Sequence, residues 1–123
     1  MALKRVALEI GMGTALQSND YTKASVRAVS DALWHNSLNM AQAFGFPRDA
    51  MIIDVEIGTQ EPDQVDCDAV AAVFPYGQVT VKSVKGGLTI PKPPREDGAA
   101  AGATIMANAA IIVSFDMEKG ASS

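Results

Sequence analysis

The sequence predicts an α+β fold, with a single four-stranded or slightly larger mixed sheet and two helices on one face. Alternating apolar residues mark the strands, and stretches with helical spacing lie between them. The chain has 123 residues, of which 48% are hydrophobic and 20% charged, and this is enough for one hydrophobic core. We therefore expect a single domain over residues 1–119 and a frayed tail over residues 120–123.

The first strand is predicted from an alternation whose apolar, buried face would carry Val6, Leu8, Ile10 and Met12. Gly11-Met-Gly13 is predicted to form a turn where this strand ends. Asp20 or Thr22 can cap a long helix whose apolar positions continue to about Phe44. Gly45 and Pro47 would end that helix.

The second half of the chain predicts three more strands and one short helix. A strand over residues 51–57 is followed by a helix that Asp66 caps and that ends near Phe74. A strand over residues 78–84 ends at Gly86-Gly87, and the last strand covers residues 109–115. Between them, residues 91–102 are predicted to form a long loop that could cover a site.

The sheet face opposite the helices is predicted to mix charged and apolar side chains, from Glu9, Ile52, Asp54, Glu56, Thr80, Lys82, Val84 and Ile112. Such a face is poorly suited to bulk water in a small monomer. Burial against copies of the same chain is the natural solution, so we expect a homo-oligomer, with a trimer as the first hypothesis.

Composition argues against several classes of protein. A net charge of −4 without a dense basic cluster argues against a nucleic-acid partner. No apolar run approaches the roughly 20 residues that span a bilayer, and the N-terminus leaves no room for a signal peptide, so we expect a cytoplasmic protein and no membrane partner. One cysteine and one histidine predict no metal site, and no motif predicts a cofactor.

A stripe along the first predicted helix carries Lys23, Arg27, Asp31 and His35. These side chains could form a solvated face with pairs at i, i+4. Alternatively, Lys23 and Arg27 could hold an anion or carbonyl beside the glycine turn. Glu9 and Glu56 could act as acid or base, unless Arg5 and Lys82 neutralise them across the strands. Under the catalytic hypothesis, the acting residues are Lys23, Glu9 and Glu56.

The ligand of that hypothesis is a small polar or anionic metabolite. Ser83, Lys85, Gly86 and Gly87 form a second glycine-bearing turn, which could face a ligand or simply start a hairpin. The full set of predicted ligand-binding residues is Gly11, Gly13, Asn19, Arg27, Asn36, Ser83, Lys85, Gly86, Gly87 and Asn108.

Nearly the whole chain resembles a small family of conserved hypothetical proteins named after a Listeria open reading frame, the Lin family. The resemblance rests mainly on Glu9-Ile-Gly-Met-Gly13, Asp20-Tyr-Thr-Lys-Ala-Ser-Val-Arg-Ala28 and His35-Asn-Ser-Leu38. Residues 81–88 and 107–110 add weaker support. The family implies no known activity.

The order of elements is more distantly similar to one repeat of ring-opening amidohydrolases such as cyanuric acid hydrolase and barbiturase. It is also similar to trimers of the YjgF and chorismate-mutase type, which bind ligands between subunits. This resemblance implies a site at a subunit interface and amide or lactam hydrolysis, although a lysine stands where the hydrolases have a serine before Gly86-Gly87. A non-catalytic small-molecule binder and an interaction module are the alternatives.

Overall fold

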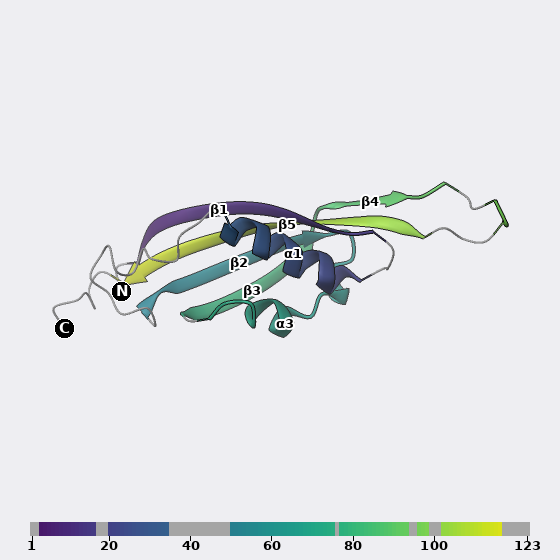
Figure 1. Cartoon of the computed structure of the whole chain (residues 1–123). Helices are drawn as coiled ribbons and strands as arrows, with labels where there is room; N and C mark the ends of the chain where they lie inside the picture. Colours follow the sequence, from purple (N-terminus) through teal and green to yellow (C-terminus); the bar gives the residue numbers. More distant parts are fainter. Residues whose placement is uncertain are drawn as a thin grey trace.

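The computed structural model describes residues 3–16, 20–34, 50–75, 77–93, 96–98 and 102–116. In this part of the chain, helices pack on a five-stranded mixed sheet, which confirms the predicted fold class (Figure 1). The elements in order are β1 (Leu3–Ala15), α1 (Tyr21–Trp34), β2 (Ile52–Thr59), the 3-10 turn η2 (Pro62–Gln64), α3 (Cys67–Ala71), β3 (Gln78–Lys85), β4 (Leu88–Pro91) and β5 (Ala103–Asp116).

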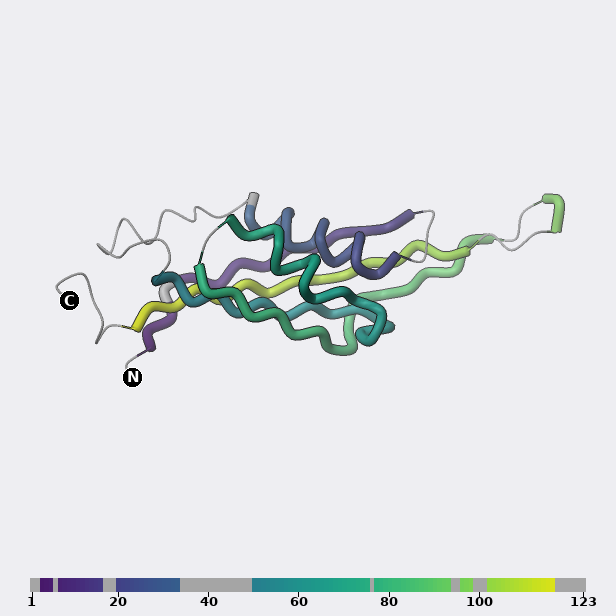
Figure 2. The backbone as a smooth tube through the Cα atoms, turned by 90° about the horizontal axis from the view of Figure 1, so that it is seen from below, coloured from purple at the N-terminus to yellow at the C-terminus, as the bar shows by residue number. Residues whose placement is uncertain are grey.

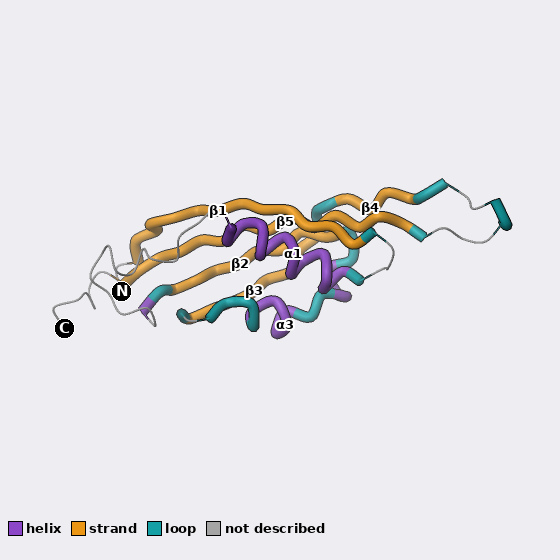
Figure 3. Tube along the Cα trace, in the orientation of Figure 1, coloured by secondary structure: helices purple, strands orange, loops and turns teal. Residues whose placement is uncertain are grey.

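The strand β5 organises the sheet, whose order is β1-β5-β2-β3 (Figure 3). One edge of β5 pairs antiparallel with β1 along almost its full length. The other edge pairs antiparallel with β2 through residues 108–114 and with β4 through residues 103–106. β2 and β3 are parallel. Therefore the chain changes partner strand between β3 and β4, at Gly86-Gly87.

The side of β1 that faces the helix layer is the opposite of the predicted one. Leu8, Ile10 and Met12 lie on the open face, the sheet face away from α1, and are 47%, 66% and 60% exposed. Glu9 pairs with the buried Ile111 and so lies on the helix side. The prediction of an apolar buried face and of Glu9 on the open face is wrong. The side chain of Val6 lies outside the described part.

The physical reason is the close approach of α1 to β1. A Cβ atom added at Gly13 would lie 2.3 Å from the backbone nitrogen of Ala28, and one at Gly11 would lie 2.4 Å from that of Ala32. Only strand residues without a side chain fit here, so the larger alternate residues face away. The predicted turn at Gly11-Met-Gly13 is wrong too, because β1 continues to Ala15.

Local capping signals give the helix starts correctly. The carboxylate of Asp20 accepts the backbone N–H of Lys23 at 2.9 Å, and α1 follows. The carboxylate of Asp66 accepts from Asp68 and Ala69, and it is the N-cap of α3, which ends at Ala71, earlier than predicted. Residues 35–44 of the first predicted helix lie outside the described residues.

The segment predicted as a loop over residues 91–102 is flanked by strand on both sides. β4 extends to Pro91 and β5 starts at Ala103, earlier than the predicted residue 109. The backbone N–H of Lys92 donates to the carbonyl of Gly102 at 3.1 Å and continues the ladder of this hairpin. The extra pairing makes a long arm that extends beyond the helices (Figures 1 and 2).

Candidate functional site

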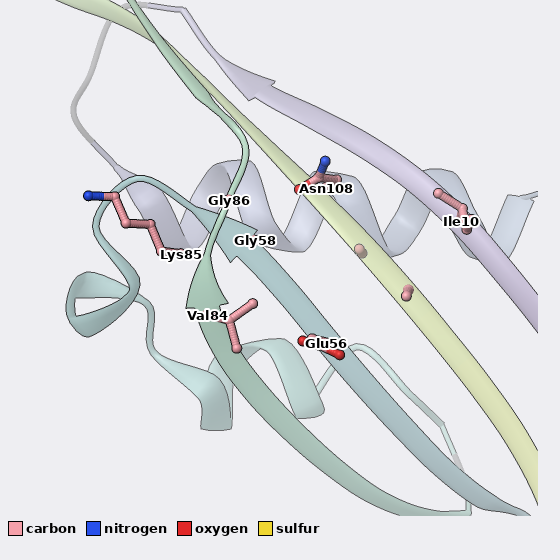
Figure 4. Close-up of a pocket in the computed structure, with 9 residues that line it drawn as sticks. Ile10, Glu56, Gly58, Val84, Lys85, Gly86 and Asn108 are labelled. Atoms are coloured by element: carbon pink, nitrogen blue, oxygen red, sulfur yellow. The ribbon is translucent and has the colours of Figure 1, made fainter.

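A hollow of about 280 Å³ lies on the open face, where β3 separates from β2 and the chain crosses to β5 (Figure 4). β2 and β5 run side by side beneath it, and β1 borders it on the far side. The residues that line it are Ile10, Glu56, Gly58, Val84, Lys85, Gly86, Asn108, Ala109 and Ala110.

Glycines shape the end of the hollow at which the chain changes partner strand. Gly87 has φ +61°, and a Cβ atom there would lie 2.2 Å from the carbonyl oxygen of Met106. The backbone N–H of Gly86 donates to the backbone carbonyl oxygen of Thr59 at 2.8 Å. The Gln60 amide donates to the carbonyls of Gly86 and Gly87, at 2.9 and 3.1 Å. This corner is therefore held by backbone contacts that a side chain would break.

Two polar side chains of complementary chemistry face this hollow. The carboxylate of Glu56 rises from β2, and the carboxamide of Asn108 rises from β5 (Figure 4). Asn108 Oδ1 lies so close over Gly58 that a Cβ atom there would come within 2.5 Å of it. A carboxylate only accepts hydrogen bonds, whereas a carboxamide both donates and accepts. The pair can therefore bind a group that offers an N–H and a C=O together.

A shallower hollow of about 190 Å³ continues along β2 and β3 and shares Glu56 with the first. Its polar side chains are Asp54, Glu56, Thr80 and Lys82, as predicted for this face. Register places Lys82 directly beside Glu56, in the position to neutralise it across the strands. The Lys85 ammonium group, in contrast, is directed away from Glu56 and Asn108 (Figure 4).

The three residues predicted to be catalytic do not meet within one chain. Lys23 is exposed on α1, and Glu9 lies on the helix side of β1. Glu56 lies on the open face. Because the sheet separates Glu56 from the other two, this chain alone does not assemble the predicted acid–base cluster.

The stripe on α1 contacts the free edge of β1. Arg27 Nη1 donates to the carbonyl oxygen of Thr14 at 2.7 Å. The backbone N–H of Met12 donates to Asp31 Oδ2 at 3.0 Å. These bonds occupy polar groups of an edge strand that would otherwise be open to another strand. Asn19, His35 and Asn36 lie outside the described residues.

Of the other predicted binding residues, Lys85, Gly86 and Asn108 line the hollow, and Gly87 shapes its corner. Gly11 and Gly13 are buried beneath α1 instead. Ser83 lies on the helix side and donates to the carbonyl of Pro62 at 2.9 Å.

Sequence reasoning did not predict that Ile10, Gly58, Val84, Ala109 and Ala110 line the hollow. A glycine at the end of the second strand was the available signal for Gly58.

The described part of the chain contains neither a cluster of metal-ligating side chains nor a membrane-spanning helix. Within it, no cluster of three or more His, Cys, Asp or Glu side chains is placed to hold a metal ion. Within the same residues, no helix has the length and apolar character needed to cross a membrane.

Comparison with known proteins gives a family match and a match to a solved structure. The model of the Lin0512 family, described as a conserved hypothetical protein, matches residues 5–113. The crystal structure of an FtsZ-like protein of unknown function from Nostoc punctiforme superposes with a TM-score of 0.82 at 32% identity, covering 94% of this chain and 98% of that one. No curated protein matches.

Proposed function

The chain belongs to the Lin0512 family of conserved hypothetical proteins, and from its site we propose that it binds a small polar metabolite as a homo-oligomer. The ligand class is a compact molecule with an amide or lactam group. The observation that carries this proposal is the hollow on the open face, in which Glu56 of β2 and Asn108 of β5 lie diagonally across the two strands beside apolar walls. Small-molecule sites commonly combine mostly apolar walls with a few convergent polar groups.

The chemistry of the two polar groups favours a neutral ligand over an anionic one. A lactam N–H can donate to the Glu56 carboxylate, while its carbonyl accepts from the Asn108 amide. An anionic group in the same place would meet the carboxylate of Glu56, whereas Lys82 does not line this hollow and the Lys85 ammonium is directed away from it (Figure 4). The volume of about 280 Å³ suits a ligand of a single small ring.

Binding is a better-supported function than amide hydrolysis. Among the residues that line the hollow there is no serine, threonine or cysteine that could act as a nucleophile. Ser83, which stands closest in sequence to the hydrolase pattern, is turned to the other face and bonded to Pro62. Glu56 and Asn108 suffice to recognise an amide without attacking it.

The test is isothermal titration calorimetry with δ-valerolactam, hydantoin and succinimide, and with δ-valerolactone as a matched ring that lacks the N–H. At least one amide ring should bind and the lactone should not. Glu56→Gln should weaken binding by about fivefold to tenfold, because a hydrogen bond to a charged group, about 1.5–3 kcal/mol, is replaced by one to a neutral carboxamide, about 0.5–1.5 kcal/mol. Asn108→Ala should weaken it as well.

Asp54→Asn is the matched control, because it removes a carboxylate from the same strand and face but outside the main hollow. It should leave the affinity within about twofold, since the interaction of separated exposed charges is largely screened. Equal loss in Asp54→Asn and Glu56→Gln, or no binding of any amide ring, would contradict the proposed site.

A further inference from the structure

The arm formed by β4 and residues 102–106 of β5 lacks a third strand along its outer part. β1 ends at Ala15, which pairs with Ile105, so beyond this point the described sheet has only two strands. The side chain of Lys92 donates to the carbonyl of Leu16 and ties the arm to the end of β1. A two-stranded hairpin by itself is only marginally stable in water, so an arm of this kind needs a further packing partner.

The apolar side chains of the arm continue the open face of the body. Leu88 pairs with Met106 and Ile90 with Thr104, and these two apolar side chains are 54% and 53% exposed. The register through β5 places them on the same face as Ile10 and Met12 of β1. Apolar side chains therefore extend from Ile10 and Met12 of β1 over Met106 of β5 to the arm, with Asn108 beside them.

We infer that the arm of one copy lies across the open face of a neighbouring copy, with its Leu88 and Ile90 packed around the neighbour's Met12 and the rest of the arm running over the neighbour's Ile10. This inference deepens the proposed function and rests on it, because Ile10 also lines the ligand-binding hollow. The neighbour's arm then forms one wall of that hollow. A homo-oligomer built this way has its binding site at the boundary between two subunits.

The length of the arm fits the part of β1 that it would cover. Six residues separate Ile90 from Glu96 at the arm tip, a span of at most about 20 Å at 3.3 Å per residue. Seven residues separate Met12 from Arg5 on β1, a span of about 23 Å. An arm whose Ile90 lies over Met12 can therefore bring its tip near Arg5.

Charge at the two ends is complementary. The described residues of the tip, 96–98, contain one glutamate and one aspartate, a net charge of −2. Arg5 is exposed, and its pairing with Ser114 places it on the open face. A second copy thus offers apolar contacts at the root of the arm and opposite charge at its tip. This combination identifies another copy of the chain as the occupant.

The first experiment measures assembly by light scattering at micromolar concentration. Wild type should scatter as an oligomer, at about 39 kDa for the expected trimer of a 12.9 kDa chain. Ile90→Asp should convert it to monomer, because a buried unpaired carboxylate is costly. Thr89→Asp is the matched control: Thr89 is the exposed neighbour on the other side of the arm, paired with the buried Ile105. It should leave the mass unchanged.

The second experiment is a cross-link that one chain cannot form alone. Met12→Cys and Ile90→Cys are combined with Cys67→Ser. In one chain these positions pair with Asn108 and Thr104 of β5. That places them four residues apart along the sheet, about 13 Å and beyond the roughly 7 Å limit for a disulfide. Oxidation should therefore produce covalently linked chains in the double variant and not in either single variant.

The outcomes separate this inference from the proposed function. A wild-type monomer, an Ile90→Asp variant of unchanged mass, or absence of the cross-link would overturn the arm contact. Amide binding by wild type that is weakened in Glu56→Gln would support the ligand proposal even if the arm contact were refuted. Conversely, a cross-linked oligomer that binds none of the amide rings would keep the arm contact and refute the ligand proposal. If both hold, Ile90→Asp should also weaken amide binding, since it removes one wall of the hollow.

Discussion

Replacing Gly13 with alanine tests whether α1 is held against β1 by backbone-to-backbone packing. The added Cβ atom would lie 2.3 Å from Ala28 N, 2.5 Å from Ala24 O and 2.6 Å from Arg27 C. All three neighbours are backbone atoms, so no side-chain rotation relieves the contact. The helix has to move away from the strand by about 1 Å to reach ordinary van der Waals separation.

The expected cost follows from two unfavourable terms and one offsetting term. Overpacking of a tight core contact costs about 1–3 kcal/mol. Moving α1 also stretches the bonds from Arg27 to Thr14 and from Met12 to Asp31, each of which contributes about 1 kcal/mol. The lower entropy of an unfolded chain with alanine offsets about 0.5–1 kcal/mol. The net loss in unfolding free energy should be about 3 kcal/mol, which lowers Tm by roughly 10 °C in a domain of this size.

Urea unfolding followed by circular dichroism, at equal protein concentrations, measures this loss. Gly98→Ala is the control: at that position a Cβ atom meets nothing within 4 Å, and only the φ of +78° costs about 1 kcal/mol. Adding Ala28→Gly should not rescue Gly13→Ala, because the clash is with the backbone of residue 28. A Gly13→Ala variant within about 0.5 kcal/mol of wild type would refute the reasoning.

Three further substitutions test local features by the same unfolding assay. Thr59→Val should stabilise the protein by about 1 kcal/mol, because the Thr59 hydroxyl is buried without a hydrogen-bond partner among the described residues. Thr80→Val, at an exposed position, is the control and should leave the stability unchanged. A Thr59→Val variant less stable than wild type would contradict this prediction. Asp31→Ala should lower the unfolding free energy by about 1–2 kcal/mol, because it removes the acceptor of the Met12 backbone N–H at the edge of β1. Lys23→Ala, on the same helix face, should change the unfolding free energy very little. Equal effects of the two substitutions would show that Asp31 acts only as a solvated charge. Asp66→Ala should lower the unfolding free energy by about 1 kcal/mol through loss of the α3 cap, and Asp66→Ser should retain most of the wild-type stability. An Asp66→Ala variant as stable as wild type would contradict a contribution of the cap.

Local signals explain what could be predicted of this fold. Alternation located the strands, and capping carboxylates at Asp20 and Asp66 located the helix starts, because both depend on residues near in sequence. The side of β1 that is buried depends instead on how closely α1 approaches. The relevant signal was the matching of small residues at positions 11, 13 and 15 with alanines at positions 24, 28 and 32. Apolar alternation alone favours the wrong face.

The candidate site was only partly predictable for a related reason. Gly86-Gly87 and Asn108 could be singled out from turn chemistry and from a family resemblance. Predicting that they lie near Glu56 requires knowing how the strands pair. β3 pairs with β2, and the next strand, β4, pairs with β5 instead. No local pattern specifies such a change of partner strand. The sequence groups Glu9 with Glu56 because apolar alternation puts Leu8, Ile10 and Met12 on the buried face of β1, whereas the structure buries the other face.

The position of β5 has a consequence for how the protein forms during synthesis. β1 and β2 each pair with β5 and not with each other, and the contact between Leu3 and Asp116 spans almost the whole described chain. Until β5 has left the ribosome, the only strand pair that can form in the described sheet is the parallel one between β2 and β3. Folding of this sheet should therefore wait for β5 and be slow for the chain's size, because such distant contacts carry a large loop-closure cost. Nascent chains shorter than residue 103 should remain sensitive to protease, and protection should appear in one step once β5 is free.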